Sequence, residues 1–280
     1  MGLAIALAGR MYEWMCDMEY LKHLRLEDEV ELQNGNSVIV LELDDLPEEM
    51  INEWANSFRQ YYCPDYKLDV LRHGTGLSRK EYLLTRVFPG QEGFGPGTKL
   101  GDFTELLISD YITYVRDFLV PKDRYVAKFN NDNSSQGTDV IGLKKKNDDD
   151  SFEDELLIIE VKARARGSSP ESRLQEAVND IQKNGDEKVA VTLNAIKHRA
   201  FDRNDLSMVA LVERFQDYIE RPFTKSYGAA AVQDTNLYDR TLIEATESEE
   251  YIKTLLFIKR KKLMDLVNTL YEKAADIDDE

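Results

Sequence analysis

Cysteine, histidine and long apolar runs are all scarce in this chain of 280 residues. Its two cysteines, Cys16 and Cys63, are too few for a disulfide framework, which predicts a reducing compartment and idle thiols, with a Cys16–Cys63 pair as the alternative. The three histidines are scattered, without zinc-site spacing. No segment approaches the ~20 apolar residues of a membrane span. These absences exclude a disulfide-rich secreted domain, a histidine zinc centre and a transmembrane protein.

A net positive charge is also lacking, because 36 Lys and Arg oppose 53 Asp and Glu and leave a net charge of −17. Proteins that bind nucleic acid usually carry a basic footprint, so the overall charge argues against tight, unaided binding to DNA. The basic residues nevertheless gather after residue 140, in clusters at 144–146, 162–166, 197–199 and 259–262. A local basic surface is therefore compatible with the sequence.

The apolar residues 2–8 resemble a secretion signal only briefly. They have no basic leader, and Arg10 and Glu13 soon interrupt them. A hydrophobic content of 42% indicates a folded protein with a substantial core. We therefore predict a soluble, cytoplasmic protein that does not associate with membranes.

The densest Gly/Pro segment, residues 89–97, is the best candidate for a domain boundary. It separates an N-terminal α/β region, residues 1–98, from a second region, residues 99–280. We expect a strand over 37–43 and a helix over 46–62 in the first region, which could serve to bind a partner.

The second region alternates strands and helices. Its patterns predict helices over 101–119, 169–183, 207–220 and 249–275, and strands over 124–129, 136–143, 156–162 and 227–232. Residues 188–203 fit a strand or a helix, and the helix is favoured. The second half of the chain is therefore predicted to contain a sheet with helices around it.

Two of these strands carry charged side chains that suit phosphodiester hydrolysis. Glu160 and Lys162 point to the same side of their strand, ~6.6 Å apart, and Asp139 can lie across from Glu160 if the strands form a hairpin. Buried carboxylates are costly unless they pair or hold a cation. We therefore predict that Asp139 and Glu160 bind Mg²⁺, for which Mn²⁺ would substitute, and that Lys162 orients or activates the attacking water. An ion pair on an edge strand is the alternative.

The short pattern of an acid, any residue and a lysine is weak by itself. It recurs at Asp65-Tyr66-Lys67 and at Asp186-Glu187-Lys188, which we interpret as polar, loop-like surface. Only Glu160-Val161-Lys162 follows an apolar strand and is preceded by an aspartate in another strand. The strand context therefore distinguishes this copy.

The segment from Gly137-Thr138-Asp139 to Ile159-Glu160-Val161-Lys162 resembles the PD-(D/E)xK nuclease superfamily. The resemblance covers about residues 101–232, with Thr138 where the motif has proline. It implies an α/β (α+β) fold with a restriction-endonuclease-like core, in which helices flank a central mixed sheet. An N-terminal α/β region and C-terminal helices would be added to that core, and Mg²⁺ would be bound at the Asp and the Glu.

The resemblance also suggests further site residues. Many members carry an acidic residue on the preceding helix, a place that Glu105 fits and for which Asp102 competes; the resemblance implies that Glu105 is a catalytic residue that helps to bind the metal or the water. Gln175 occupies a position where related nucleases often have a polar residue near the site. Arg164 and Arg166 continue the Glu160 face if the strand persists, and could then contact substrate phosphates.

More narrowly, the helix sequence Gly101-Asp102-Phe103-Thr104-Glu105-Leu106-Leu107 together with the two strand motifs is similar to the HamA family of the Hachiman antiphage defence system. This similarity implies a bacterial DNase effector controlled by a helicase partner, HamB. The alternatives are a catalytically inactive, nuclease-like binding module and an RNase or repair nuclease on the same fold. The acidic charge balance adds the expectation that a partner presents the DNA.

Overall fold

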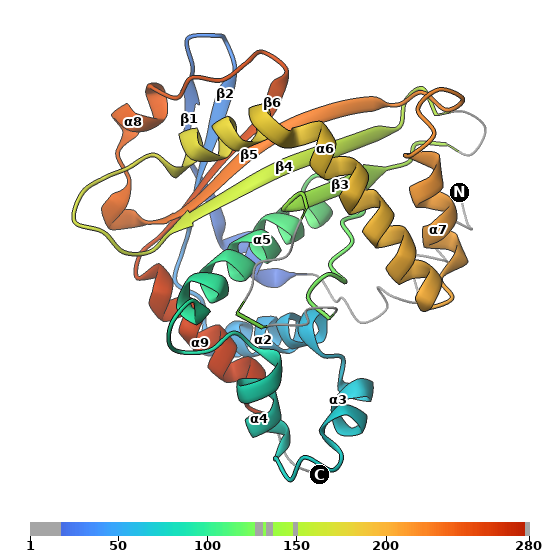
Figure 1. Cartoon of the computed structure of the whole chain (residues 1–280). Helices are drawn as coiled ribbons and strands as arrows, with labels where there is room; N and C mark the ends of the chain where they lie inside the picture. The colour runs from blue at the N-terminus through green and yellow to red at the C-terminus, as the bar shows by residue number, and fades with distance from the viewer. Residues whose placement is uncertain (1–17, 127–130, 133–136, 148–150, 278–280) are drawn as a thin grey trace.

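The computed structural model describes residues 18–126, 131–132, 137–147 and 151–277, apart from the side chains of 184–186. A single sheet of six strands, in the order β1-β2-β6-β5-β4-β3, runs through the molecule (Figure 1). The strands are β1 (Leu24–Glu31), β2 (Ser37–Leu43), β3 (Val140–Lys144), β4 (Glu155–Arg164), β5 (Thr224–Asp234) and β6 (Ile252–Arg260). The β1–β2 and β3–β4 pairs are antiparallel, and the three pairs between β2 and β4 are parallel. The predicted α/β fold with a central mixed sheet is confirmed.

Helices cover both faces of this sheet (Figure 1). They are α2 (Glu48–Tyr62), α3 (Asp65–Arg72), α4 (Arg79–Tyr82), α5 (Gly95–Tyr114), α6 (Arg173–Asp202), α7 (Leu206–Arg214), α8 (Arg240–Glu244) and α9 (Leu263–Ala275), with short helical turns η1 (Glu19–His23), η2 (Leu83–Val87) and η3 (Thr235–Leu237). Apolar residues of α2, α5 and α9 pack on one face, and those of α6 and α7 pack on the other. The sheet therefore separates two apolar cores.

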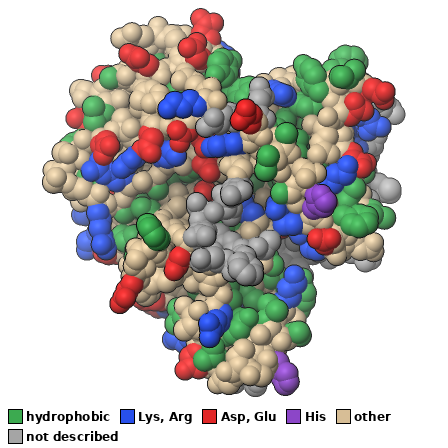
Figure 2. All heavy atoms as spheres, viewed as in Figure 1, with side chains coloured by type: hydrophobic (Ala, Val, Ile, Leu, Met, Phe, Trp, Pro, Cys, Tyr) green, Lys and Arg blue, Asp and Glu red, His purple; other side chains and the backbone are tan. Residues whose placement is uncertain are grey.

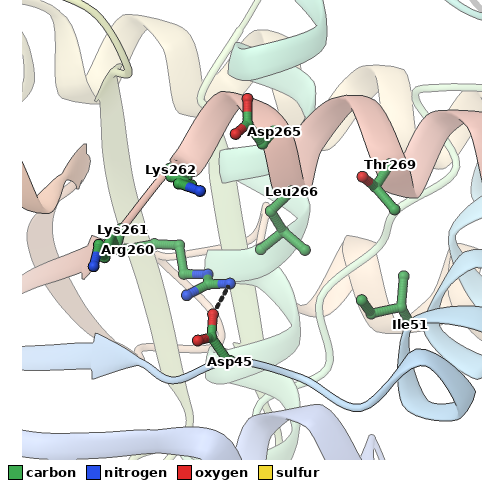
Figure 3. Close-up of a pocket in the computed structure, with 8 residues that line it drawn as sticks. All are labelled: Asp45, Ile51, Arg260, Lys261, Lys262, Asp265, Leu266 and Thr269. Atoms are coloured by element: carbon green, nitrogen blue, oxygen red, sulfur yellow. Dashed lines mark ion pairs between the residues drawn. The ribbon is translucent and has the colours of Figure 1, made fainter.

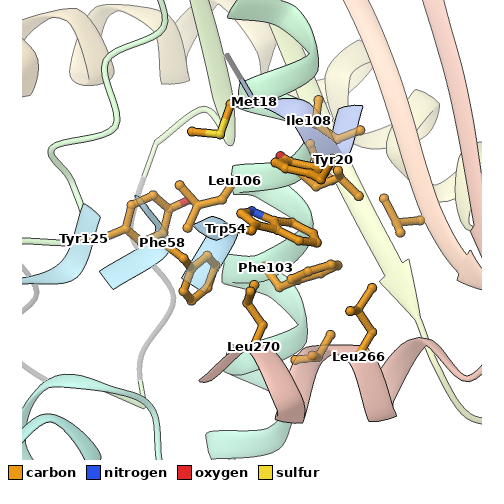
Figure 4. Close-up of a cluster of buried hydrophobic side chains, with 14 of the residues drawn as sticks. Met18, Tyr20, Trp54, Phe58, Phe103, Leu106, Ile108, Tyr125, Leu266 and Leu270 are labelled. Carbon is orange, nitrogen blue, oxygen red and sulfur yellow. The ribbon is translucent and has the colours of Figure 1, made fainter. Parts of the chain in front are cut away.

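The core on the α5 face is rich in aromatic rings (Figure 4). Trp54 of α2 stacks on Tyr20, with ring centroids 3.8 Å apart, and also contacts Phe103 of α5. All three residues are almost fully buried. Large rings on neighbouring elements therefore fix α2 and α5 against each other.

Side chains of β4 alternate between the two cores, as the pleat of a strand requires. Ile159 and Val161 belong to the core on the α5 face, whereas Ile158 belongs to the core on the α6 face. Glu160 and Lys162 come two and four residues after Ile158, so their side chains point to the same face of β4 as Ile158, the face that α6 covers. This placement decides which helix can contact the charged residues of β4.

The sheet includes strands from both sides of residue 98, because β2 lies directly beside β6. Helix α5 begins at Gly95, inside the Gly/Pro segment, with Pro96 in its first turn. Proline is well tolerated there because the first helical N–H groups have no intrahelical acceptor. The division of the chain after residue 98 stays a prediction.

The expectation of one helix over residues 249–275 was wrong. Residues Ile252–Arg260 form β6, and only Leu263–Ala275 form a helix. β6 is paired on both sides and mostly buried, and residues 255–258 in its middle form an apolar run without alternation. Such a run is easily mistaken for part of a buried helix. The chain turns at Lys262, which has a positive φ of 56°.

Other helices and strands begin or end at residues that differ from the predicted ones. The preference for a helix over 188–203 is confirmed, but that segment is continuous with the preceding helix in α6, which begins at Arg173 rather than near Pro170. The predicted helix over 207–220 ends early, at Arg214. In the predicted strand over 124–129, residues 124–126 form a turn and residues 127–129 lie outside the described residues.

The remaining elements largely agree. The strands over 37–43, 156–162 and 227–232 and the helix over 46–62 are confirmed within a few residues, whereas α5 occupies 95–114 rather than 101–119 and β3 begins at Val140. Residue 136, the start of that predicted strand, lies outside the described residues.

Cys63 is a free, buried thiol. Cys16 and the apolar residues 2–8 also lie outside the described residues. None of the helices described is both long enough and apolar enough to cross a membrane.

Candidate functional site

The β3–β4 hairpin brings Asp139 next to Glu160. Val140 pairs with Ile159 in the antiparallel register, so the residue before Val140 lies across from the residue after Ile159. Asp139 Oδ2 accepts a hydrogen bond of 2.8 Å from the N–H of Val161. The carboxylate of Asp139 is therefore fixed at the edge of β4, beside Glu160.

Glu160 is a buried carboxylate with only 2% of its surface exposed. Its Oε2 accepts a hydrogen bond of 2.8 Å from Lys188 Nζ. Its Oε1 is also buried, and no group among the described residues donates a hydrogen bond to it. Burial and the nearby charge of Asp139 raise the pKa of Glu160 to about 7, against the opposing effect of Lys188. Glu160 thus carries one satisfied oxygen and one unsatisfied oxygen.

Lys162 forms an ion pair with Asp180, with 2.5 Å between Nζ and Oδ2. Burial lowers the pKa of Lys162, but the hydrogen bond and the charge of Asp180 outweigh that effect and hold the pKa above its usual value. The ammonium group therefore keeps its proton near neutral pH. This favours a role in orienting water or in stabilising negative charge over a role as a proton acceptor.

Helix α6 supplies both partners of the charged residues on β4. Asp180 and Lys188 lie on α6 and pair with Lys162 and Glu160, respectively. The sequence analysis missed both residues, and its interpretation of residues 186–188 as a polar loop was wrong because they are helical. Recognition of 173–202 as one helix beside β4 would have indicated them.

A single turn of α6 also holds the loop that carries Asp139. Thr192 Oγ1 accepts a hydrogen bond of 2.9 Å from the N–H of Thr138 and donates one of 2.8 Å to the carbonyl of Lys188. Proline has no N–H, so it could not make the first of these bonds. Thr138 can make this bond, which a proline at position 138 would lose.

Gly137 makes this close approach possible. Its φ is +106°, and a Cβ atom there would lie 2.5 Å from Thr192 Oγ1. We expect Gly137→Ala to lower the free energy of unfolding by about 1–3 kcal/mol, because it adds backbone strain and a steric clash. Urea denaturation measures this effect.

Gly101→Ala is the matched control for this substitution. Gly101 lies inside α5, has no positive φ and has open space around its Cβ position. Alanine there should stabilise the helix by about 0.5–1 kcal/mol. Equal stability of the Gly137→Ala protein and the wild type would refute the packing role given to Gly137.

Glu105 lies on α5 and is joined to Asp139 through Arg124. Arg124 Nη2 lies 2.6 Å from Glu105 Oε2, and Tyr125 donates to the same oxygen at 2.8 Å. Arg124 Nη1 donates to the carbonyls of Thr138 and Asp139, at 2.8 and 2.9 Å. Burial raises the pKa of Glu105 above its usual range despite the Arg124 charge, and Asp139 adds to the rise. Glu105 therefore supports the backbone that presents Asp139.

Asp102, the competing acidic residue, lies among aromatic side chains. It accepts a hydrogen bond of 2.7 Å from the hydroxyl of Tyr62, which is also 2.6 Å from the hydroxyl of Tyr271. Asp102 contributes negative charge near Glu105. Of the two acidic residues, Glu105 is the one that shares Arg124 with the loop of Asp139.

The three proposed substrate residues lie in different surroundings. Strand β4 persists to Arg164, which pairs with Glu171, but Arg166 lies beyond the strand and is exposed. Gln175 exchanges two hydrogen bonds with the backbone of Glu247, of 2.7 and 3.0 Å. The structure therefore places Arg164 on the Lys162 side of β4, whereas Arg166 is past the strand and Gln175 secures a loop.

Comparison with models of known protein families identifies the family of this chain. The model of the HamA family matches residues 18–274, which include every residue of the site described above. The chain belongs to the HamA family. Membership makes it a component of the Hachiman antiviral defence system. No curated protein sequence matches the chain closely enough to be called a relative.

The carboxylates of this HamA-family chain fit a hard divalent cation. Among the described residues, no group of three or more Cys, His, Asp and Glu side chains is arranged to hold a metal. Mg²⁺, however, is usually bound through only one or two carboxylates, together with waters and substrate phosphates. Asp139 and Glu160 supply two carboxylates, and the unsatisfied Oε1 of Glu160 is a free ligand atom. Their mutual repulsion would be relieved by such an ion.

The surface of this HamA-family chain mixes charges of both signs (Figure 2). Lys and Arg side chains are spread over the face shown, with Asp and Glu among them. Many of the cations are neutralised: Arg199 and Arg203 both pair with Asp123. The positive charge of these two arginines is therefore offset locally by a carboxylate.

A hollow of about 280 Å³ lies elsewhere, between the end of β6 and α9 (Figure 3). Arg260 spans it with an ion pair of 2.7 Å to Asp45. Its lining residues are Asp45, Ile51, Arg260, Lys261, Lys262, Asp265, Leu266 and Thr269. None of them belongs to the site around Glu160 in this HamA-family chain.

Proposed function

We propose that this chain is a Mg²⁺-dependent deoxyribonuclease of the PD-(D/E)xK type, acting as the effector of its defence system. The observation that carries the proposal is the pairing of two carboxylates across the β3–β4 hairpin. Asp139 and Glu160 lie opposite each other, and Glu160 keeps a buried oxygen without a donor among the described residues. Lys162 follows on the same side of β4. Acidic ligands and a lysine at one sheet edge suit phosphodiester hydrolysis.

In this proposal Asp139 and Glu160 hold Mg²⁺. When bound, the ion would neutralise charge on the phosphate and lower the pKa of water. Asp180 would fix the Lys162 ammonium so that it orients the attacking water or stabilises the charge that develops on the phosphoryl oxygens. Glu105, through Arg124, would hold the Asp139 loop in place.

Control by a helicase partner is the second part of the proposal. A chain with a net charge of −17 repels the phosphates of DNA. Arg164, on the strand of Glu160, is paired with Glu171, and Arg199 and Arg203 are paired with Asp123, which limits the attraction that they offer to phosphates. A partner that presents the DNA would overcome this repulsion.

The test is a substrate panel. Single-stranded DNA, duplex DNA and RNA are incubated with the chain, alone and with the helicase, in Mg²⁺, Mn²⁺ or EDTA. We expect cleavage of DNA in Mg²⁺ and Mn²⁺, no cleavage in EDTA, and stronger cleavage with the helicase. Cleavage of RNA but not of DNA would identify the chain as a ribonuclease instead of a deoxyribonuclease. Cleavage in EDTA would contradict the role of the metal.

The competing function is an inactive, nuclease-like binding module. The observation in its favour is that Glu160 and Lys162 each have an ion-pair partner on α6. This module would cleave none of the substrates, with or without the helicase. Such a result would refute the nuclease proposal.

A further inference from the structure

We propose that Lys188 is a resident counter-ion of Glu160, which competes with a divalent cation for the charge of that carboxylate and thereby lowers the metal affinity of the site. This inference rests on the proposed function, because it assigns the metal to Glu160. It adds a positioning residue from α6, outside the Asp, Glu and Lys of the strand motif. The consequence is that Glu160 has a cationic partner before any metal binds.

The burial of Glu160 requires a cation nearby. Its side chain is 2% exposed, and a buried carboxylate without a partner costs several kcal/mol. Lys188 satisfies Oε2 at 2.8 Å, while Asp139 repels the same carboxylate. Lys162 contributes a smaller favourable charge, since its ammonium is held by Asp180. Among the described residues, Lys188 is thus the group that neutralises Glu160 directly.

Lys188 is placed so that its ammonium can leave without disturbing the site. The side chain is 29% exposed, so the ammonium can move into solvent. The backbone stays fixed, because Thr192 Oγ1 donates to the carbonyl of Lys188 and accepts from Thr138. The Lys162–Asp180 pair shares no atom with the Lys188 contact. Displacement would therefore require only a rotation of one side chain.

A divalent cation and the Lys188 ammonium compete for the charge of the same carboxylate, the ion at the free Oε1 and the ammonium at Oε2. The ion gains from both Asp139 and Glu160, whereas the ammonium contacts Glu160 alone. A hydrogen bond to a charged group contributes about 1.5–3 kcal/mol. Removal of the ammonium should then strengthen metal binding by about tenfold or more, because a tenfold change corresponds to about 1.4 kcal/mol.

The experiment measures Mn²⁺ binding to the full chain by electron paramagnetic resonance, with no DNA present. Lys188→Met is compared with the wild type in the same buffer at the same pH. We expect Lys188→Met to bind Mn²⁺ about tenfold or more tightly. Lys188→Arg should stay within about threefold of the wild type, because it keeps the charge.

Two control variants fix the interpretation. Lys197→Met removes another half-buried lysine of α6, whose partner is Glu213 at 2.9 Å, and should leave Mn²⁺ binding unchanged. Glu160→Gln should abolish Mn²⁺ binding. If Lys188→Met is poorly folded by its melting temperature, Lys188→Gln replaces it, with the same expected direction.

The possible outcomes separate this inference from the function on which it rests. Equal or weaker Mn²⁺ binding by the neutral variants, with normal binding by the wild type, would overturn the role of Lys188 and leave the metal site standing. Mn²⁺ binding that is absent from the wild type and from Lys188→Met would overturn both. Tighter binding in Lys188→Met but not in Lys197→Met supports the competition between Lys188 and the metal.

Discussion

Glu160→Gln should lower Mg²⁺-dependent DNA cleavage by about 10³-fold or more, with little change in stability. The substitution keeps the shape of the side chain but removes the charge that would bind the metal. The glutamine carbonyl can still accept the hydrogen bond from Lys188. Initial rates of cleavage with the helicase present, together with urea denaturation, measure both effects.

A second substitution on the same strand provides the control. Glu155 lies at the start of β4 and accepts a hydrogen bond of 2.6 Å from the hydroxyl of Ser226. Glu155→Gln removes one negative charge from β4 without touching the hairpin edge at Asp139, so cleavage should stay within about twofold of the wild type. Cleavage by Glu160→Gln within tenfold of the wild-type rate would show that Glu160 is not a metal ligand.

Arg124→Met should be the most destabilising of the substitutions considered, at about 3–5 kcal/mol. It leaves Glu105, of which 8% is exposed, buried without its ionic partner. It also removes the donors to the carbonyls of Thr138 and Asp139. The loss should appear in the free energy of unfolding, and cleavage should fall because the Asp139 loop is released.

A double variant separates these two effects. Arg124→Met with Glu105→Gln removes the unpaired buried carboxyl, so part of the stability should return. The contacts to the Thr138 and Asp139 carbonyls remain lost, so cleavage should stay low. A loss below 1 kcal/mol in Arg124→Met, or restored cleavage in the double variant, would contradict the link from Glu105 to Asp139.

The strand half of the site could be predicted from the sequence because its signal is local. An apolar run before Glu160 identifies a buried strand, and strict alternation places Lys162 on the same side. The hairpin register then follows from the aspartate at the start of the neighbouring strand. These inferences need only the geometry of strands.

The helical half could not be predicted in the same way. Asp180 and Lys188 contact Lys162 and Glu160 because α6 packs on one face of β4. The sequence of α6 alone does not indicate which strand the helix covers. Residues 186–188 are polar and follow a glycine, so local composition favoured a loop. Tertiary packing overrode that preference.

Buried strands were the other source of error. Leu255 to Ile258 lie on β6 between two parallel neighbours, so both faces are covered and alternation disappears. The same apolar run is compatible with a helix until its partners are known. The fold class was predictable because it depends on the order of elements, but the limits of this element were not.

The central claim is that the residues at the β3–β4 edge cut DNA with Mg²⁺. The most direct measurement is a time course of duplex DNA cleavage by the wild type and by Lys162→Ala, each with the helicase, in Mg²⁺ and in EDTA. We predict cleavage by the wild type in Mg²⁺ and none in the other three reactions. Undiminished cleavage by Lys162→Ala in Mg²⁺, or cleavage by the wild type in EDTA, would contradict the claim.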